Sequence, residues 1–383
     1  MAVAVVGYKW SMPRRVLLGK ECRRAASRSV SCALAVAAAV VVLAAGAGCS
    51  EGSGGSGGPT SSSSSIVSVP ASPSTTSTVQ AIPATGWQRR ADAPEPRQEI
   101  SAAVVGDRVW VVGGITDDGP SRGVESYDPT TDSWRPGPDL PEPLHHAAAV
   151  VYRGELVVVG GFAGGGADLY DRPSDRVLAL RDGTWVDLPR LRRPRGAAAV
   201  AVVGDTLLLV GGRDQSLLIR PTEAFDGTAW SDRAPIPVPR DHLAAATDGR
   251  YVYAVGGRYL GPSQTSDSVE RYEPATDTWQ TLAPLPTARG GHGLTFAGGR
   301  LIAVGGEDAS RVYPQVEAFD PAANTWASLP PLVTPRHGLG LVAVKGTVYA
   351  LVGGTAAGVA PSAATESLDL PGATDTPGHI AGT

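Results

Sequence analysis

The stretch Val109-Trp110-Val111-Val112-Gly113-Gly114 is a short apolar run that ends in a glycine doublet. Five further apolar runs end in the same way, at Gly160-Gly161, Gly211-Gly212, Gly256-Gly257, Gly305-Gly306 and Gly353-Gly354. Successive doublets are 47, 51, 45, 49 and 48 residues apart. Short apolar runs bounded by glycine and polar turns predict buried strands, and a nearly constant period of this length predicts an array of repeated structural units.

Tryptophan gives a second periodic signal in step with the glycine doublets. Spacings of 47, 51, 45, 49 and 47 residues separate Trp87, Trp134, Trp185, Trp230, Trp279 and Trp326. Glycine at a strand end permits positive φ and leaves room for a bulky neighbour. Because a buried aromatic side chain covers on the order of 150–250 Å², we expect each tryptophan to fill the space between two adjacent sheets.

Together the two signals resemble the kelch repeat over residues 85–370. In three repeats an aromatic residue lies seven positions before the tryptophan, in the pairs Tyr127–Trp134, Tyr272–Trp279 and Phe319–Trp326. Two repeats depart from this spacing. Phe225 lies five positions before Trp230, and residues 177–180 of the second repeat contain no aromatic residue. We therefore expect the second and third repeats to be locally irregular.

The resemblance to kelch proteins implies an all-β fold, a six-bladed β-propeller with four strands in each blade. The last repeat stops at Ser367-Leu368-Asp369-Leu370, before any tryptophan strand. The segment Trp87-Gln88-Arg89-Arg90 lies ahead of the first repeat and can supply the missing strand. We predict that this N-terminal strand closes the last blade, which hides sheet edges that would otherwise be exposed.

The first 48 residues have the composition of an export signal. Residues 1–28 hold seven Lys/Arg and one Glu, and an apolar stretch over residues 33–47 follows. The ending Ala47-Gly48-Cys49 resembles a bacterial lipobox, although Gly46 stands where lipoproteins usually have leucine. We expect a signal peptide over residues 1–48, lipidation of Cys49 and an anchor on the outer side of the cell membrane. The alternative is an uncleaved membrane anchor, for which the apolar run is shorter than usual.

Composition also predicts the regions that flank the propeller. Residues 49–84 are rich in Gly, Ser, Thr and Pro, with too few large apolar residues to fold, so we expect a disordered tether. We expect a flexible tail over residues 371–383. The three cysteines are Cys22, Cys32 and Cys49, so no disulfide is expected in the propeller even though export permits one.

Charge argues against nucleic acid as a partner. Residues 1–48 hold seven of the 33 basic and one of the 37 acidic residues, so the rest of the chain has 26 basic and 36 acidic residues. The resulting net charge of −10 repels a polyanion over the surface as a whole.

The loops of the predicted propeller divide between two faces. The turns between the first and second strands and between the third and fourth strands lie on one face. The second-to-third loops and the blade connections lie on the other, and these loops are long: residues 115–123, 162–175, 213–222, 258–267 and 307–315. Because function concentrates on long loops held by a rigid scaffold, we expect the working face there.

Arginine recurs just before the innermost strand of five repeats. Arg97, Arg195, Arg240 and Arg289 lie 16 residues before a doublet, Arg336 lies 17 before, and Leu144 takes the place in the second repeat. We expect these arginines to ring the channel mouth and, as the kelch resemblance implies, to bind acidic peptides, since arginine makes bidentate contacts with carboxylates. The alternative is that they belong to the general kelch pattern and pair with a neighbouring blade.

Histidines and loop residues complete the predicted ligand-binding set. Five histidines lie one to three positions after the arginine position: His145, His146, His242, His292 and His337. Of these, His145, His242 and His292 join the predicted set, and the long loops add Arg213, Arg258 and Tyr259. Other charged residues near the mouth are Asp117, Asp118, Asp214, Glu307, Asp308 and Arg311. Converging imidazoles can bind a metal, but histidine also recurs here in kelch repeats, so we expect no metal and no cofactor. No catalytic residue is assigned, because HExxH, CxxC and phosphate-loop motifs are absent.

These features favour a recognition module rather than an enzyme. We predict a monomeric, membrane-tethered propeller that binds a protein, peptide or glycan at the cell envelope. The alternative is a sugar epimerase or mutarotase that resembles sialic-acid mutarotase and uses the same mouth. Galactose oxidase has similar kelch repeats, but its Cys–Tyr cross-link needs a cysteine, and none follows Cys49. A deep pocket with converging Arg, His and carboxylate groups would favour the enzyme.

Overall fold

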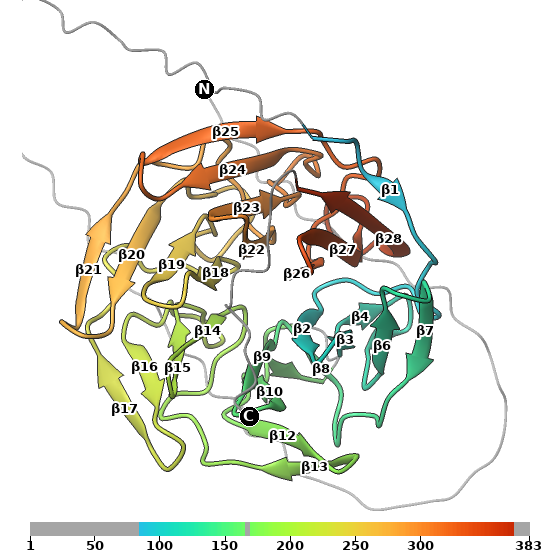
Figure 1. The fold of residues 1–383 in the computed structure, drawn as a ribbon. Helices are drawn as coiled ribbons and strands as arrows, with labels where there is room; N and C mark the ends of the chain where they lie inside the picture. Colours follow the sequence, from blue (N-terminus) through green and yellow to red (C-terminus); the bar gives the residue numbers. More distant parts are fainter. Residues whose placement is uncertain (1–83, 165–168, 371–383) are drawn as a thin grey trace, which may run out of the picture. The chain divides into compact units, whose positions relative to one another are not determined.

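The computed structural model describes residues 84–164 and 169–370, which form six four-stranded antiparallel sheets set as blades around one axis (Figure 1). Blades 1 to 5 follow in chain order as β2-β3-β6-β7, β9-β10-β12-β13, β14-β15-β16-β17, β18-β19-β20-β21 and β22-β23-β24-β25, and blade 6 is β26-β27-β28-β1. The predicted leader, Cys49, the tether and the tail lie outside the described residues. Within the described ranges no helix is long and apolar enough to cross a membrane.

Each blade contributes one strand to each of four positions, from the axis outward. The innermost strands are β2 (Ser101–Val105), β9 (Ala148–Tyr152), β14 (Ala199–Val203), β18 (Ala244–Thr247), β22 (Gly293–Ala297) and β26 (Gly340–Val344). The second strands are β3 (Arg108–Val112), β10 (Glu155–Val159), β15 (Thr206–Val210), β19 (Val252–Val255), β23 (Arg300–Val304) and β27 (Thr347–Gly354). The third strands are β6 (Val124–Asp128), β12 (Val177–Arg181), β16 (Thr222–Phe225), β20 (Val269–Glu273), β24 (Val316–Asp320) and β28 (Pro361–Asp369).

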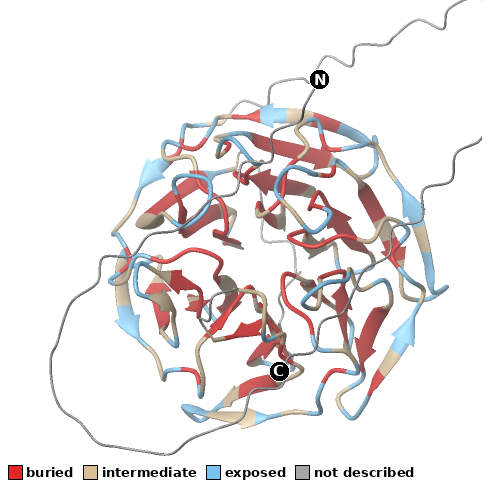
Figure 2. Cartoon of the chain, turned by 180° about the vertical axis from the view of Figure 1, so that it is seen from behind, coloured by how far each residue is buried: buried red, intermediate tan, exposed pale blue. Residues whose placement is uncertain are grey.

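The outermost strands are β7 (Ser133–Pro136), β13 (Thr184–Asp187), β17 (Trp230–Arg233), β21 (Thr278–Thr281), β25 (Thr325–Leu329) and β1 (Gln88–Arg89). Two short pairs lie outside the blades: β4 (Ile115–Thr116) with β5 (Gly119–Pro120), and β8 (Leu144–His145) with β11 (Phe162–Ala163). Burial falls toward the rim, where the outermost strands are largely exposed (Figure 2).

The innermost strands use small residues because neighbouring blades converge toward the axis. A Cβ on Gly293 would lie 2.5 Å from Cβ of Leu341 in the next blade. A Cβ on Gly340 would lie 2.7 Å from Cβ of Ala102, across the junction between blades 6 and 1. Glycine at these positions therefore permits a close approach of two sheets.

The core consists of six apolar clusters, one at each interface between adjacent blades. Each cluster contains or contacts one tryptophan of an outermost strand. Every indole N–H also donates to a backbone carbonyl of the preceding blade connection at 2.8–3.1 Å, in the pairs Trp87–Pro330, Trp134–Ala91, Trp185–Pro138, Trp230–Pro189, Trp279–Ala234 and Trp326–Ala283. The prediction that tryptophan fills the space between sheets is confirmed.

The glycine doublets join each blade to the next. The N–H of the second glycine in blades 1 to 5, and of Gly353 in blade 6, donates to the carbonyl at the arginine position of the following blade, in the pairs Gly114–Leu144, Gly161–Arg195, Gly212–Arg240, Gly257–Arg289, Gly306–Arg336 and Gly353–Arg97. The first glycine has positive φ, and a Cβ at Gly113 would lie 2.3 Å from the Leu144 carbonyl oxygen. In blade 6, Val352 takes that first position at φ 48°, which explains why Arg336 lies one residue farther from its doublet.

Pairing at the ends of the chain confirms the predicted closure. In blade 6, β1 pairs with β28 through Gln88↔Ser367 and Arg89↔Glu366. The expected irregularity of blades 2 and 3 is wrong. Leu180 pairs with Trp185 and Phe225 pairs with Trp230 as regularly as Tyr127 pairs with Trp134, and only the connecting turn is shorter.

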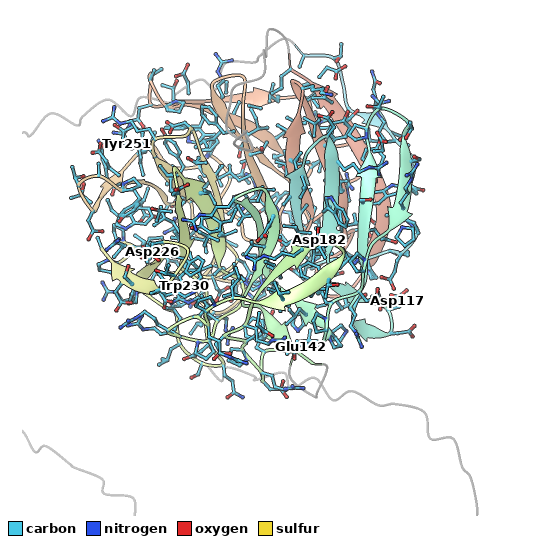
Figure 3. All side chains as sticks on the ribbon, turned by 60° about the horizontal axis from the view of Figure 1, so that its bottom comes forward. Asp117, Glu142, Asp182, Asp226, Trp230 and Tyr251 are labelled. Atoms are coloured by element: carbon cyan, nitrogen blue, oxygen red, sulfur yellow. The ribbon has the colours of Figure 1, made fainter. Side chains whose placement is uncertain are left out.

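The two faces differ in their loops, as four antiparallel strands require. We call the face that carries the second-to-third loops and the blade connections the long-loop face. Asp117 and Glu142 belong to it and lie low in Figure 3, whereas Asp182, Asp226 and Tyr251, from the short turns, lie higher in that view.

Candidate functional site

The five recurring arginines are structural, which corrects the expectation that they ring the channel mouth. Their side chains are 0–1% exposed, so none of them meets solvent or a ligand. Each forms an ion pair with a glutamate of the third strand in its own blade, in the pairs Arg97–Glu125, Arg195–Glu223, Arg240–Glu270, Arg289–Glu317 and Arg336–Glu366. Burial lowers the pKa of Arg195 and of Arg336 to about 10, so both remain charged at neutral pH.

Blade 2 lacks both partners of this ion pair. Leu144 stands at the arginine position and Leu178 at the glutamate position, and both belong to the apolar cluster between blades 1 and 2. A buried charge without its partner is costly, so replacing both residues by leucine avoids the penalty that a single replacement would bring.

A ring of left-handed residues lies two positions after each arginine position. These residues are Glu99, His146, Ala197, His242, Gly291 and Gly338, with φ between 51° and 62°. The amide N–H of one donates to the carbonyl of the preceding one, from His146 onto Glu99 through to Gly338 onto Gly291. Non-glycine residues with positive φ are uncommon and strained. Three polar side chains are nevertheless kept there, from blades 1, 2 and 4.

Polar side chains line a hollow of about 350 Å³ at the long-loop face, which we call the mouth hollow. Its polar lining consists of Gln98, Glu99, His146, Tyr170, Arg258, Glu307, Asp308 and His337. Apolar residues of the loops, including Leu169, Pro262 and Val359, form the rest of its wall. The lining residues come from five of the six blades, so the hollow is a property of the whole ring.

Arg258 contacts several polar and charged groups in and behind the mouth hollow. Its Nη1 donates to Glu307 Oε1 at 2.9 Å, and its Nη2 lies 2.6 Å from His242 Nε2 and 3.3 Å from the Tyr170 hydroxyl. Asp241 lies behind it, 3.4 Å from Arg258 Nε and 2.5 Å from His242 Nδ1. Asp241 therefore accepts the Nδ1 proton of His242, which directs the Nε2 lone pair toward Arg258.

Glu99 lies between two imidazoles. Its Oε2 is 3.2 Å from His146 Nε2, and its Oε1 is 3.5 Å from His337 Nε2. Burial raises the pKa of Glu99 and of Asp241. Burial also holds the pKa of His146 and His242 well below their usual range, so both imidazoles are neutral at neutral pH. Burial raises the pKa of Tyr170 to about 12. The cluster thus combines carboxylates, neutral imidazoles and one guanidinium, a set suited to proton transfer or to holding a cation.

The structure brings only part of the predicted set into this cluster. Of that set, His242 and Arg258 are in it. His146 and His337 are also in the cluster but were not in the predicted ligand-binding set. His145 is fully buried and stacks on Phe162, and burial lowers its pKa to about 4. His292 packs at an interface position where blades 1, 4 and 6 have Ile100, Leu243 and Leu339, so its predicted place at the mouth is wrong.

The remaining predicted residues lie at the edge of the cluster. The Arg213 guanidinium lies 4.7 Å from the centre of the Tyr170 ring, and Tyr259 is exposed on its loop. Asp117, Asp118 and Arg311 are exposed or lie at the loop tips, and Asp214 and Asp308 cap the turns of their own loops. Only Asp308 among these five lines the mouth hollow.

Four residues of the cluster were not singled out from the sequence at all: Gln98, Glu99, Asp241 and Tyr170. Alignment of the repeats contains the signal for three of them. Glu99 occupies the position of His146 and His242, and Gln98 and Asp241 occupy the position of His337. Tyr170 comes from the irregular 162–175 loop, where no repeat position identifies it.

Comparison with known proteins gives the same repeat. The KLHDC2/KLHL20/DRC7 Kelch-repeats domain matches residues 190–354, and the Kelch motif matches residues 96–141. The chain contains kelch repeats and folds as a six-bladed propeller. Kelch propellers are typical protein-interaction modules.

Relatives of this kelch propeller share its repeats over part of their length. Kelch-like protein terF of Aspergillus terreus is 30% identical over 250 residues, 57% of this chain and 53% of the fungal protein. Kelch-like protein 15 of Gallus gallus is 32% identical over 154 residues, 37% of this chain and 30% of that protein. The chain thus spans about half or less of these relatives. The solved structure of YjhT matches with a TM-score of 0.64 at 15% identity, over 74% of this chain and 97% of YjhT, a likeness of fold alone.

Proposed function

We propose that this kelch propeller is an exported, lipid-anchored recognition module whose long-loop face binds a protein, peptide or glycan at the cell envelope. The composition of residues 1–48, the lipobox-like ending at Cys49 and the Gly/Ser-rich tether support export and anchoring. The tether would hold the propeller near the membrane while leaving its binding face accessible.

The exposed apolar residues of the long-loop face carry the proposal of recognition. Among the described residues, five large apolar side chains are exposed: Leu217, Tyr259, Leu260, Val333 and Val359. All five lie on second-to-third loops or on a blade connection, and Leu217 is 64% exposed. A hydrogen bond from Arg213 Nη1 to the Leu260 carbonyl ties the first two loops together. Apolar side chains gathered on one face with a polar surround mark an interaction surface.

The charge of the mouth hollow favours a basic or hydroxyl-rich ligand over an acidic peptide. Glu99, Glu307 and Asp308 line it, and Asp241 lies behind Arg258. Four carboxylates therefore face one guanidinium. The recurring arginines that were expected to attract an acidic peptide are neutralised within their own blades. A lysine or arginine side chain, or the hydroxyl groups of a glycan, fits this lining.

Capture from membranes tests recognition. The lipidated protein is cross-linked in intact membranes beside a Leu217→Asp/Leu260→Asp variant, which places charge on the apolar loops. The control is Ala323→Asp, an exposed alanine in a short turn on the opposite face. We expect a specific partner to be captured by the wild type and the control and lost with the double variant at an unchanged melting temperature. Equal capture by all three proteins would contradict the proposal.

Lipidation has its own test. We expect the N-terminal peptide of the purified protein to begin at a diacylated Cys49 by mass spectrometry. Cys49→Ala should move the protein out of the membrane fraction. A Cys49→Ala protein that stays in the membrane would support the uncleaved anchor instead.

A second candidate is a sugar-converting enzyme at the same mouth, because Glu99, His146, Tyr170 and Arg258 converge in a hollow. Exchange of anomers by NMR, with sialic acids and other sugars, tests it. Faster exchange that disappears in a folded Glu99→Gln variant would favour the enzyme. Uncatalysed rates for every sugar would leave recognition as the function.

A further inference from the structure

We propose that Glu99, Glu307 and His337 bind one divalent transition-metal ion of the zinc type, with a fourth ligand position open to the mouth hollow. This site goes beyond recognition by the loops, and its test does not depend on any partner.

The three side chains come from three blades and each presents one ligand atom. His337 Nε2 lies 3.5 Å from Glu99 Oε1 and 3.6 Å from Glu307 Oε2, and the three ligand atoms lie within 4.8 Å of one another. A tetrahedral zinc ion with bonds of about 2.0–2.1 Å holds nitrogen and oxygen ligands about 3.4 Å apart. The two distances from His337 Nε2 are already close to that value.

Neighbouring groups set the orientation of the ligand atoms. Arg258 binds Oε1 of Glu307, which leaves Oε2 directed toward His337. Gln98 is fixed by its own contacts, since its Nε2 donates to the Gly358 carbonyl and its Oε1 accepts from the Ala360 amide. The same Gln98 Nε2 lies 3.3 Å from His337 Nε2. Because an amide nitrogen only donates, this contact identifies His337 Nε2 as the unprotonated ring nitrogen, and a metal ion would take its lone pair in place of the Gln98 amide.

The buried charges favour a cation. Glu99, Asp241 and Glu307 contribute three formal negative charges and are at most 9% exposed, whereas Arg258 contributes one positive charge. A buried excess of two negative charges is costly. One divalent ion at the proposed position would bring the sum to zero.

A second imidazole faces the other oxygen of Glu99. His146 Nε2 is buried without a hydrogen-bond partner among the described residues, and it points at Glu99 Oε2 from 3.2 Å away. Glu99 therefore has an imidazole nitrogen at each of its oxygens. A second triad, Glu99, His146 and His242, also converges. We assign the metal to the His337 side, because the charged Arg258 Nη2 lies 2.6 Å from His242 Nε2, whereas the neutral Gln98 amide lies 3.3 Å from His337 Nε2 and is easier to displace.

The open fourth ligand position determines which groups can bind to the metal. Glu99, Glu307 and His337 all line the mouth hollow, so a ligand that enters it reaches the fourth position. Three protein ligands and one open position are typical of zinc sites that bind a water or a substrate. A carboxylate, hydroxyl or carbonyl oxygen is the group that this position would accept.

Cobalt and zinc titrations of the chelator-treated, purified protein test the site. We expect one equivalent of Co²⁺ to bind with the visible absorption of a tetrahedral ion and to be displaced by Zn²⁺. Glu307→Gln and His337→Gln should each weaken binding by about 100-fold or more. His292→Leu changes a buried histidine outside the site and should leave one equivalent bound.

Three results would overturn the proposal. They are sub-stoichiometric metal in the folded wild type, unchanged affinity in folded Glu307→Gln, and loss of metal in His146→Gln with retention in His337→Gln. Thermal melts of each variant identify any that fail to fold, and Glu307→Gln, which keeps the size of the side chain, is the variant that decides.

Discussion

At the scale of single residues, a glycine in this fold is needed either for its backbone conformation or for the space that a side chain would fill. Comparing Gly106 with Gly113 distinguishes these two roles. Gly106 and Gly113 both have φ of 60°. Nothing lies within 4 Å of a Cβ at Gly106, whereas a Cβ at Gly113 would lie 2.3 Å from the Leu144 carbonyl. We expect Gly106→Ala to cost about 1 kcal/mol from backbone strain, and Gly113→Ala to cost several times more. Denaturant unfolding of both variants measures the difference, and equal losses would show that close approach is not why the doublet exists.

His292 is a second single residue with a measurable consequence. It is 5% exposed, neither ring nitrogen has a hydrogen-bond partner in the described structure, and burial holds its pKa well below the usual range. Its folded-state pKa lies below its unfolded value of about 6.5, so its contribution to stability is lost as the pH falls through that value. We expect His292→Leu to raise the melting temperature at pH 7. The gain should widen between pH 6.5 and pH 5, and a gain that shrinks over this range would contradict the assignment.

At the scale of the blade, the buried Arg–Glu pair and its replacement in blade 2 make a natural comparison. Glu317→Leu leaves Arg289 buried without a partner and should cost about 3–5 kcal/mol. Adding Arg289→Leu recreates the Leu144 and Leu178 arrangement and should recover most of that loss. A double-mutant cycle by denaturant unfolding measures the coupling. Additive losses would mean that blade 2 tolerates leucine for reasons of its own.

At the scale of the whole propeller, closure depends on the N-terminal strand. Trp87 is 7% exposed and donates to Pro330, and β1 supplies the outer edge of blade 6. Removal of a buried tryptophan alone costs about 3–5 kcal/mol. We therefore expect a chain that begins at residue 93 to melt about 10 °C below one that begins at residue 84. Equal melting temperatures would show that blade 6 is stable with three strands.

The sequence predicted the fold more completely than the site. Each repeat makes the same contacts with its neighbours, so the spacings of Gly113 and Trp134 and their equivalents determine both the number of blades and their closure. The recurring glutamates, such as Glu125 and Glu317, were an available sign that the arginines are paired. Contacts across the axis are different. Glu99, Arg258 and His337 come from three different blades. They meet because the closed ring brings these blades together at the axis, so no pattern within one repeat predicts that they are close.

The hydrogen bonds from the glycine doublets join every pair of neighbouring blades in the same way. No blade interface therefore depends on where the chain begins and ends. The described chain starts and finishes within one sheet, because β1 lies beside β28. A circularly permuted protein, with residue 370 linked to residue 84 and new ends at the exposed Asp117-Asp118 turn of the long-loop face, would therefore keep all six blade interfaces. At present β1 begins beside the end of β28 at the short-turn face, where the Leu370 N–H donates to the Gly346 carbonyl. A membrane tether attached at the new ends would leave from the long-loop face instead, so the direction in which the binding face points can be changed without altering a single contact in the core.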